Sequence, residues 1–233
     1  MGMLWLTLLL LGQLFAVDQP AYLGLDGGVY GPNLKRIGLG SGTSLAIHGQ
    51  TAYLVGSDGR VWSAGGSDWR PLEGAPALAQ AQKVVVEPSG ALVILGTDSG
   101  IYRLRRNWYR IGLASARDLD VSPAGDLFIV GSDAHVWTSA AGQTEWRLYN
   151  ALAAGKKLAA AQGMVYLIGT DNGVYRITPE QIERQGLATA QEISVSSSGQ
   201  VAIVGMDNGV YYLQSGDWKR QGGGTARLVI WPR

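Results

Sequence analysis

The sequence predicts an all-β protein: a six-bladed β-propeller of four-stranded blades, its ring closed by the C-terminal strand pairing into the first blade. The chain of 233 residues has 34 glycines and only 2 phenylalanines, which indicates many tight turns between short strands rather than helices with broad apolar faces. The pattern Gly-x-Asp-x-x-[Val/Ile]-[Tyr/Trp] also occurs six times, with its aspartate at Asp26, Asp58, Asp98, Asp133, Asp171 and Asp207. We number the repeats one to six after these aspartates.

Each repeat predicts a β-hairpin, followed by one more strand and then the first strand of the next repeat. An aliphatic run such as residues 92–95 precedes the glycine, and a short strand with Tyr or Trp follows it. Asp-Gly or Asn-Gly at four of the turns supplies residues that tolerate positive φ. In the fourth repeat the strands are expected at 118–122, 127–131, 136–138 and 146–149. Four short strands in a unit of this length are typical of a propeller blade.

The two ends of the chain complement each other. The first repeat begins directly at the strand 21–23 and lacks the strand that precedes it in the other repeats. The last repeat is followed by an extra strand, 225–231, which is similar to 115–121. We therefore expect the extra strand to complete the first blade, which removes two exposed sheet edges.

Residues 4–15 form an almost unbroken apolar run, which has the length of a signal-peptide core and is too short to span a bilayer. We expect a signal peptide over 1–16 and a propeller over 17–233; a buried strand or helix is the alternative for the apolar run. This predicts a secreted or periplasmic protein, and no transmembrane segment in the mature chain.

Composition excludes several classes of function. Nineteen basic and 18 acidic residues leave a net charge of +1, which predicts no nucleic-acid partner and no general attraction to anionic surfaces. Cysteine is absent, so disulfides and thiolate sites are excluded. The only histidines, His48 and His135, belong to no nucleophile motif. We expect no catalytic residue, metal or cofactor.

Several segments resemble tectonin repeats, in particular 100–103, 108–111, 116–121, 131–133 and 136–137. Tectonins and the related tachylectin-like propellers are lectins, so the resemblance implies glycan recognition. The first and fifth repeats lack the tectonin tryptophan, so we do not expect a full set of equivalent sugar sites. The repeats also resemble those of regulator-sensor, sialidase-like and photosystem-assembly propellers, although the Ser-x-Asp-x-Gly-x-Thr-Trp box of sialidases is missing.

Two groups of side chains are candidates for ligand binding. Trp69, Trp108, Trp146 and Trp218 follow the hairpins and suit either a sugar face or packing between blades. Arg103, Arg106 and Arg110, with Arg105, form a basic cluster that suits sulfate, phosphate or carboxylate groups; its alternative is a charged outer strand.

The remaining notable residues have mainly structural interpretations. We expect the six repeat aspartates to accept backbone hydrogen bonds in their turns, and the aromatic residues four positions later to pack between sheets. Asp118, Asp120 and Glu192 are candidates for the lining of a central channel, where carboxylates suit Ca²⁺ or act on a substrate. Lys83 and Leu228 at corresponding positions argue against a ring of acids.

The sequence thus favours an exported, non-catalytic recognition propeller with a glycan or surface polysaccharide as its ligand. A protein–protein scaffold or assembly factor is the alternative, with a protein as partner. A glycan hydrolase or lyase that uses the channel carboxylates is a third hypothesis.

Overall fold

The computed structural model describes residues 19–65, 68–72 and 80–232, and every element in this part is a β-strand. The predicted signal peptide, 1–16, lies outside the described residues. In the described part no helix is long and apolar enough to cross a membrane.

The strands follow the repeats. The first half of the chain contains β1 (Ala21–Leu23), β2 (Gly28–Tyr30), β3 (Arg36–His48), β4 (Thr51–Gly56), β5 (Val61–Ala64), β6 (Arg70–Pro71), β7 (Ala81–Val86), β8 (Leu92–Gly96), β9 (Ile101–Leu104) and β10 (Trp108–Arg110). The second half contains β11 (Ala116–Val121), β12 (Leu127–Gly131), β13 (His135–Ser139), β14 (Arg147–Ala161), β15 (Met164–Gly169), β16 (Gly173–Ile177), β17 (Ile182–Val195), β18 (Val201–Gly205), β19 (Gly209–Gln214), β20 (Asp217–Thr225) and β21 (Leu228–Ile230).

All strand pairs are antiparallel, and they form three hydrogen-bonded sheets of seven, four and ten strands, none of which closes on itself. The sheets are long because β3, β14 and β17 each run without a break from the outer edge of one repeat to the inner strand of the next. The sequence predicts a separate short strand at 146–149, and this boundary is wrong. The register between β13 and β14 shifts at His135 and Val136. These shifts let β14 pair first with β13 and then with β15.

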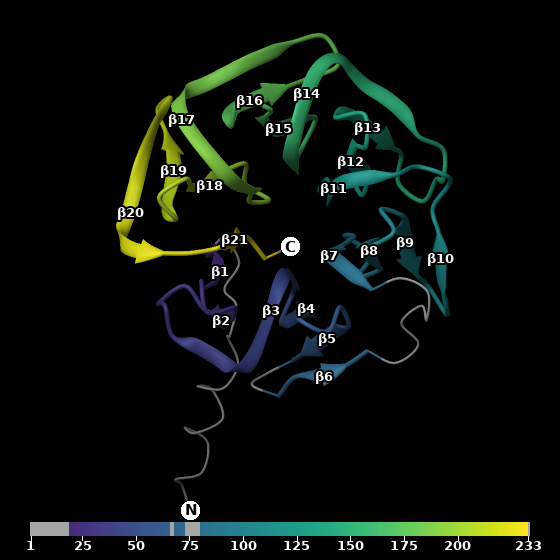
Figure 1. Ribbon diagram of the computed structural model, residues 1–233, viewed down its shortest axis with the longest axis vertical. Helices are drawn as coiled ribbons and strands as arrows, with labels where there is room; N and C mark the ends of the chain where they lie inside the picture. Colours follow the sequence, from purple (N-terminus) through teal and green to yellow (C-terminus); the bar gives the residue numbers. More distant parts are fainter. Residues whose placement is uncertain (1–18, 66–67, 73–79, 233) are drawn as a thin grey trace, which may run out of the picture.

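The strands are arranged around a central axis, with β3, β7, β11, β14, β17 and β21 nearest to it (Figure 1). The last strand, β21, pairs with the first strand, β1, through Leu228 opposite Leu23 and Ile230 opposite Ala21. A cluster of buried side chains joins β21 to the sixth repeat, where the Tyr212 and Trp231 rings lie 5.8 Å apart. The last described strand, β21, therefore packs against both the first and the sixth repeat.

The turn after each repeat aspartate explains the Asp-Gly and Asn-Gly pairs. The residue after the aspartate has positive φ in all six turns, with 74° at Gly27, 73° at Gly59 and 64° at Asn172. In the fourth turn Ala134 adopts a φ of 69°, a conformation that is strained for a residue with a Cβ atom and no side-chain amide. Among the six turns, only this one has neither glycine nor asparagine in the two positions after the aspartate.

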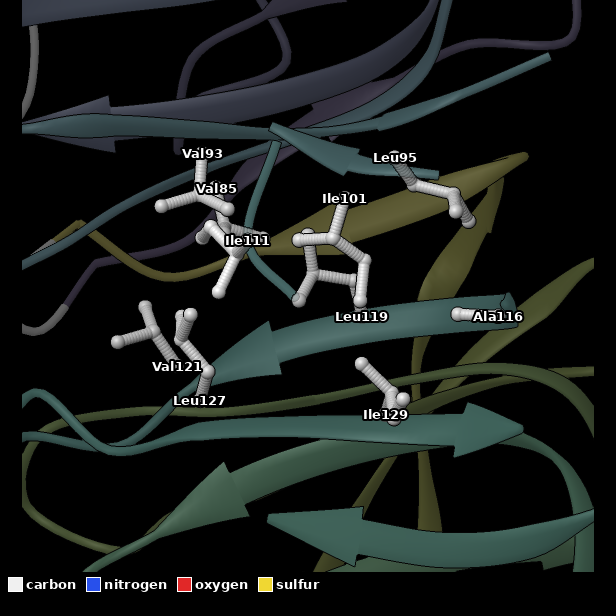
Figure 2. Packing of buried hydrophobic residues seen from close by; sticks show 10 residues of the cluster. All are labelled: Val85, Val93, Leu95, Ile101, Ile111, Ala116, Leu119, Val121, Leu127 and Ile129. Atoms are coloured by element: carbon white, nitrogen blue, oxygen red, sulfur yellow. The ribbon is translucent and has the colours of Figure 1, made fainter. Parts of the chain in front are cut away.

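The core lies between neighbouring repeats. Figure 2 shows one cluster, in which Val93, Leu95 and Ile101 of the third repeat face Leu119 and Ile129 of the fourth. Neighbouring repeats cover both faces of each repeat's sheet. The strands in the middle of a sheet therefore have continuous aliphatic sequences rather than alternating apolar and polar residues. This packing fixes the position of each repeat against the next.

Candidate functional site

The six repeat aspartates hold their own turns. In every repeat the carboxylate accepts a hydrogen bond from the backbone N–H two residues later, with distances of 2.9–3.0 Å. A tyrosine hydroxyl or tryptophan indole four residues after the aspartate donates to the same carboxylate, as from Tyr175 to Asp171 at 2.8 Å. These aromatic rings are half-buried against the core clusters. The aspartates thus have the turn-forming role that the sequence predicts.

Replacing Asp98 by alanine should lower the free energy of unfolding by about 1–2 kcal/mol, because two hydrogen bonds to the turn are lost. The Tyr102 hydroxyl is the main cause of the lowered pKa of Asp98; burial opposes it, and the Gly100 amide and the charge of Arg110 add to the lowering. The stabilisation is therefore present above the unfolded pKa of about 4 and disappears as the pH falls through the folded pKa. Urea unfolding at pH 7 and about pH 3 measures both effects.

The control is Asp217→Ala, because Asp217 makes only an exposed ion pair of 3.8 Å with Lys219. An Asp98→Ala protein with unchanged stability at pH 7 would contradict the turn-forming role.

The structure does not bring the predicted arginine cluster together. Arg103 is 1% exposed; its Nε donates to Oε1 of Glu87 at 2.9 Å, and its Nη2 lies 2.7 Å from the same oxygen in an ion pair. Burial opposes the charge of Arg103, but the Tyr109 hydroxyl and Glu87 outweigh it and raise its pKa. Arg106 and Arg110 are exposed. A surface patch that includes Arg103 is therefore wrong, since alternate residues of β9 point to opposite sides of the sheet and the partner of Arg103 is buried.

The four candidate tryptophans are all half-buried at the boundary between two repeats. The indole N–H of Trp146 donates to the backbone oxygen of Ile111 at 3.3 Å, and that of Trp218 donates to the oxygen of Gln185 at 2.8 Å. Trp69 lies against Gly40, and Trp108 packs against the core cluster between the second and third repeats. Each ring therefore has a packing role, with part of its surface open.

Trp146 lines a groove of about 600 Å³ between the third and fourth repeats. We call this site the Trp groove. Trp137 and Trp146 form its aromatic part, Leu113 its apolar rim, and Asp133 and Glu145 its charged part. Hydroxyls of Ser115, Ser132 and Thr144 complete the lining. A volume of this size accommodates a small ligand, and rings beside hydroxyl and carboxylate groups suit a polar ligand with one apolar face.

The cavity on the central axis is much smaller, about 40 Å³, which is room for roughly three water molecules. Asp120, Lys83, Ser44 and Ser194 line it together with apolar residues of the inner strands. This volume does not fit a sugar, so the geometry does not favour chemistry on a glycan at this place.

The channel carboxylates connect neighbouring inner strands. Asp118 is 1% exposed; its Oδ1 lies 2.7 Å from Nζ of Lys83, and its Oδ2 accepts the Leu158 amide at 2.8 Å. Asp120 accepts the Ala160 amide at 2.9 Å. These bonds join β7, β11 and β14, so a Ca²⁺-binding or catalytic assignment for the pair has no support in the geometry.

Glu192, the third channel candidate, pairs with Lys157 at 2.8 Å. Burial lowers the pKa of Lys157, but the carboxylates of Asp118 and Glu192 outweigh it and raise this pKa. In the described part of the chain, no three His, Asp or Glu side chains lie close enough together to hold a metal ion.

Trp137, Leu113 and Glu145 lie beside Trp146 in the groove, and their spacing in the sequence does not predict this. Trp137 occupies the aromatic position of the repeat, and only its place beside Trp146 makes it part of a groove. Leu113 carries a signal that sequence reasoning can find: leucine recurs three residues before the inner strand in several repeats.

No known protein family and no curated protein matches the sequence. Solved structures share its fold. A structure of YCF48 bound to a D1 peptide is 15% identical, covers 87% of this chain and 77% of its own, and superposes with a TM-score of 0.60. The WD40 propeller domain of Doa1 gives 14% identity, 87% and 78% coverage and a TM-score of 0.60. Virginiamycin B lyase from Staphylococcus aureus is 12% identical, covers 87% of this chain and 73% of its own, and superposes with a TM-score of 0.58.

These similarities are too low in identity to show more than the fold, and they include a lyase as well as propellers without an enzyme name. They support a propeller repeat and do not single out tectonins. The chain is accordingly an all-β protein with a β-propeller fold, similar to the YCF48 and WD40 structures.

Proposed function

We propose that this protein is a non-catalytic recognition propeller that binds a glycan in the Trp groove. The observation that carries the proposal is the position of Trp146 and Trp137 in one open groove beside the carboxylates of Asp133 and Glu145. An indole face packs on the apolar face of a sugar ring, and carboxylate and hydroxyl oxygens accept hydrogen bonds from sugar hydroxyls.

The architecture behind this function is a ring of six blades. It is supported by the six Gly-x-Asp turns, by the pairing of β21 with β1, and by the cluster that joins β21 to the sixth repeat. In this arrangement each blade has four strands, with β3, β14 and β17 shared between two blades. The Trp groove then lies between the third and fourth blades.

Export of the mature chain, 17–233, remains part of the proposal on sequence grounds, because residues 4–15 have the length and composition of a signal-peptide core. Mass measurement of the protein recovered from an expressing cell tests it. A secreted form that begins at Val17 is the expected result, and an intact N-terminus on protein retained inside the cell contradicts it.

Replacing Trp146 by alanine should weaken glycan binding about five- to thirtyfold, because one stacked ring contributes on the order of 1–2 kcal/mol. The measurement begins with a glycan array that includes neutral, O-methylated and acidic sugars, followed by titration calorimetry with the best ligand.

Trp218→Ala is the matched control for this loss. Trp218 also donates to a backbone oxygen and also lies against a glycine, Gly186, but it belongs to the sixth repeat. Both variants should lose similar stability, and only Trp146→Ala should lose binding. Equal affinity of the two variants, or an array without any signal, would overturn the proposal.

A peptide is the second candidate ligand for the same groove, because the similar YCF48 structure has a D1 peptide bound. A displayed peptide library separates the two candidates. Selection of peptides whose binding depends on Trp146, with no glycan signal, would favour the protein-scaffold function.

A further inference from the structure

Three leucines stand almost fully in solvent at equivalent positions of the fold. Leu113, Leu152 and Leu187 are 92%, 79% and 89% exposed. Each lies three residues before the small residue at which the next inner strand begins to pair, Ala116, Gly155 and Ala190. Side chains with such exposure bury little area, so packing within the chain does not explain the recurrence.

The three leucines lie on one face of the molecule. The small residue after each one donates its backbone N–H to the Gly-x-Asp turn of the preceding repeat, as from Gly155 to Ala134 at 2.9 Å. The segments that carry the leucines are therefore bound to these turns. Two turns add apolar residues of their own, since Leu25 and Met206 are each 57% exposed. We call these five residues the leucine face.

The leucine face also carries basic groups. Arg117 and Lys156 follow Leu113 and Leu152 by four residues, and both are exposed. Arg117 donates to the backbone oxygen of Ser132, and Lys156 donates to the amide oxygen of Asn172. Both partners are neutral, and within the described ranges neither cation forms an ion pair. The repeat aspartates lie in the turns of the same face, and four of the six pair with other arginines. Asp98 and Asp133 are the two that form no ion pair within the described ranges, so Arg117 and Lys156 are the positive charges of this face that stand outside any ion pair there.

We propose that the leucine face rests on a lipid bilayer that contains anionic headgroups. The three most exposed leucines lie in three different segments that connect one repeat to the next, and each protrudes singly. Such side chains enter a fluid interface independently, whereas a protein partner needs a matching pit for each of them. Arg117 and Lys156 are complementary in charge to anionic lipid. Leu113 belongs to both the leucine face and the rim of the Trp groove, whereas Leu152 and Leu187 are not part of the groove lining.

Vesicle flotation tests the proposal with the full mature chain. We expect binding to vesicles of equimolar phosphatidylcholine and phosphatidylglycerol, and weaker binding to vesicles of phosphatidylcholine alone. The variant Leu152→Ser/Leu187→Ser, whose changes lie outside the Trp groove, should reduce the partition coefficient at least about tenfold, because the insertion of two leucines is lost. Arg117→Gln/Lys156→Gln should remove most of the preference for anionic vesicles.

The matched control is Leu34→Ser/Leu148→Ser, which removes two exposed leucines, 58% and 45%, outside the leucine face. It should bind as the unmodified chain does. All substituted residues are exposed, so unchanged thermal unfolding is expected in every variant. Absence of flotation, equal loss in the control, or a vesicle-independent dimer that Leu152→Ser/Leu187→Ser dissociates would overturn the proposal; the last result would assign the face to a second copy of the chain.

Discussion

Removing residues 226–233 should abolish cooperative folding. Leu228, Val229 and Trp231 are 7%, 0% and 4% exposed, and burial of three such side chains contributes about 5–9 kcal/mol at roughly 1.5–3 kcal/mol each. This is comparable with the whole stability of a typical domain, about 5–15 kcal/mol. The deletion also removes one of the two antiparallel partners of β1, so that only β2 remains beside it and a sheet edge is exposed. Near-UV circular dichroism and size-exclusion chromatography measure the result.

A point substitution provides a finer test of the same strand. Val229→Asp places a carboxylate in a fully buried position without shortening the chain, and it should be almost as damaging as the deletion. Arg227→Ala is the control, because Arg227 is exposed and only its backbone N–H bonds to Leu23. A truncated chain that unfolds cooperatively within 1 kcal/mol of the full chain would contradict closure of the ring by β21.

Replacing Arg103 by methionine should lower the free energy of unfolding by about 3–5 kcal/mol, because the Glu87 carboxylate stays buried without its partner. The two side chains are only 2% and 11% exposed, so water does not compensate well for the lost guanidinium. Arg103 also donates to the Tyr109 hydroxyl at 3.3 Å, and this hydroxyl loses its donor as well. Guanidinium chloride unfolding measures the loss.

The double variant Glu87→Leu/Arg103→Met separates the ion pair from packing. Removing both charges should restore most of the stability, since two apolar side chains of similar size replace a pair with a high cost of desolvation. Arg106→Met, an exposed change three residues away, should alter the stability by less than about 0.5 kcal/mol. A loss below 1 kcal/mol for Arg103→Met alone would show that water reaches Glu87.

The turns and hairpins could be predicted because their interactions are local. Asp26 binds the amide of Gly28 and the hydroxyl of Tyr30, two and four residues later, and the same contacts recur in every repeat. Such contacts depend only on residue type and spacing, so the six aspartates could be assigned a turn-forming role. The pairing partner of the extra C-terminal strand follows from the same repeat, once the first repeat is seen to lack a strand.

The surface residues could not be assigned in this way. The sequence does not distinguish Arg103 from Arg106, but Arg103 is buried against Glu87 and Arg106 is exposed. Trp146 and Trp218 make the same local contacts, and only for Trp146 do Leu113 and Trp137 complete the groove described above. Asp118 and Asp120 suggest a ligand site by composition, whereas in the fold their oxygens hold the neighbouring inner strand.

The sequence by itself determined the all-β class, the six Gly-x-Asp turns and the role of their aspartates, because these features depend on contacts within a few residues. The tertiary structure alone decided which arginine is buried, which tryptophan lines a groove, and that Leu113, Leu152 and Leu187 share one face. The physical reason is that burial of a side chain in this fold is set by residues some 16–40 positions away in the chain, either in another strand of the same sheet or in the neighbouring repeat.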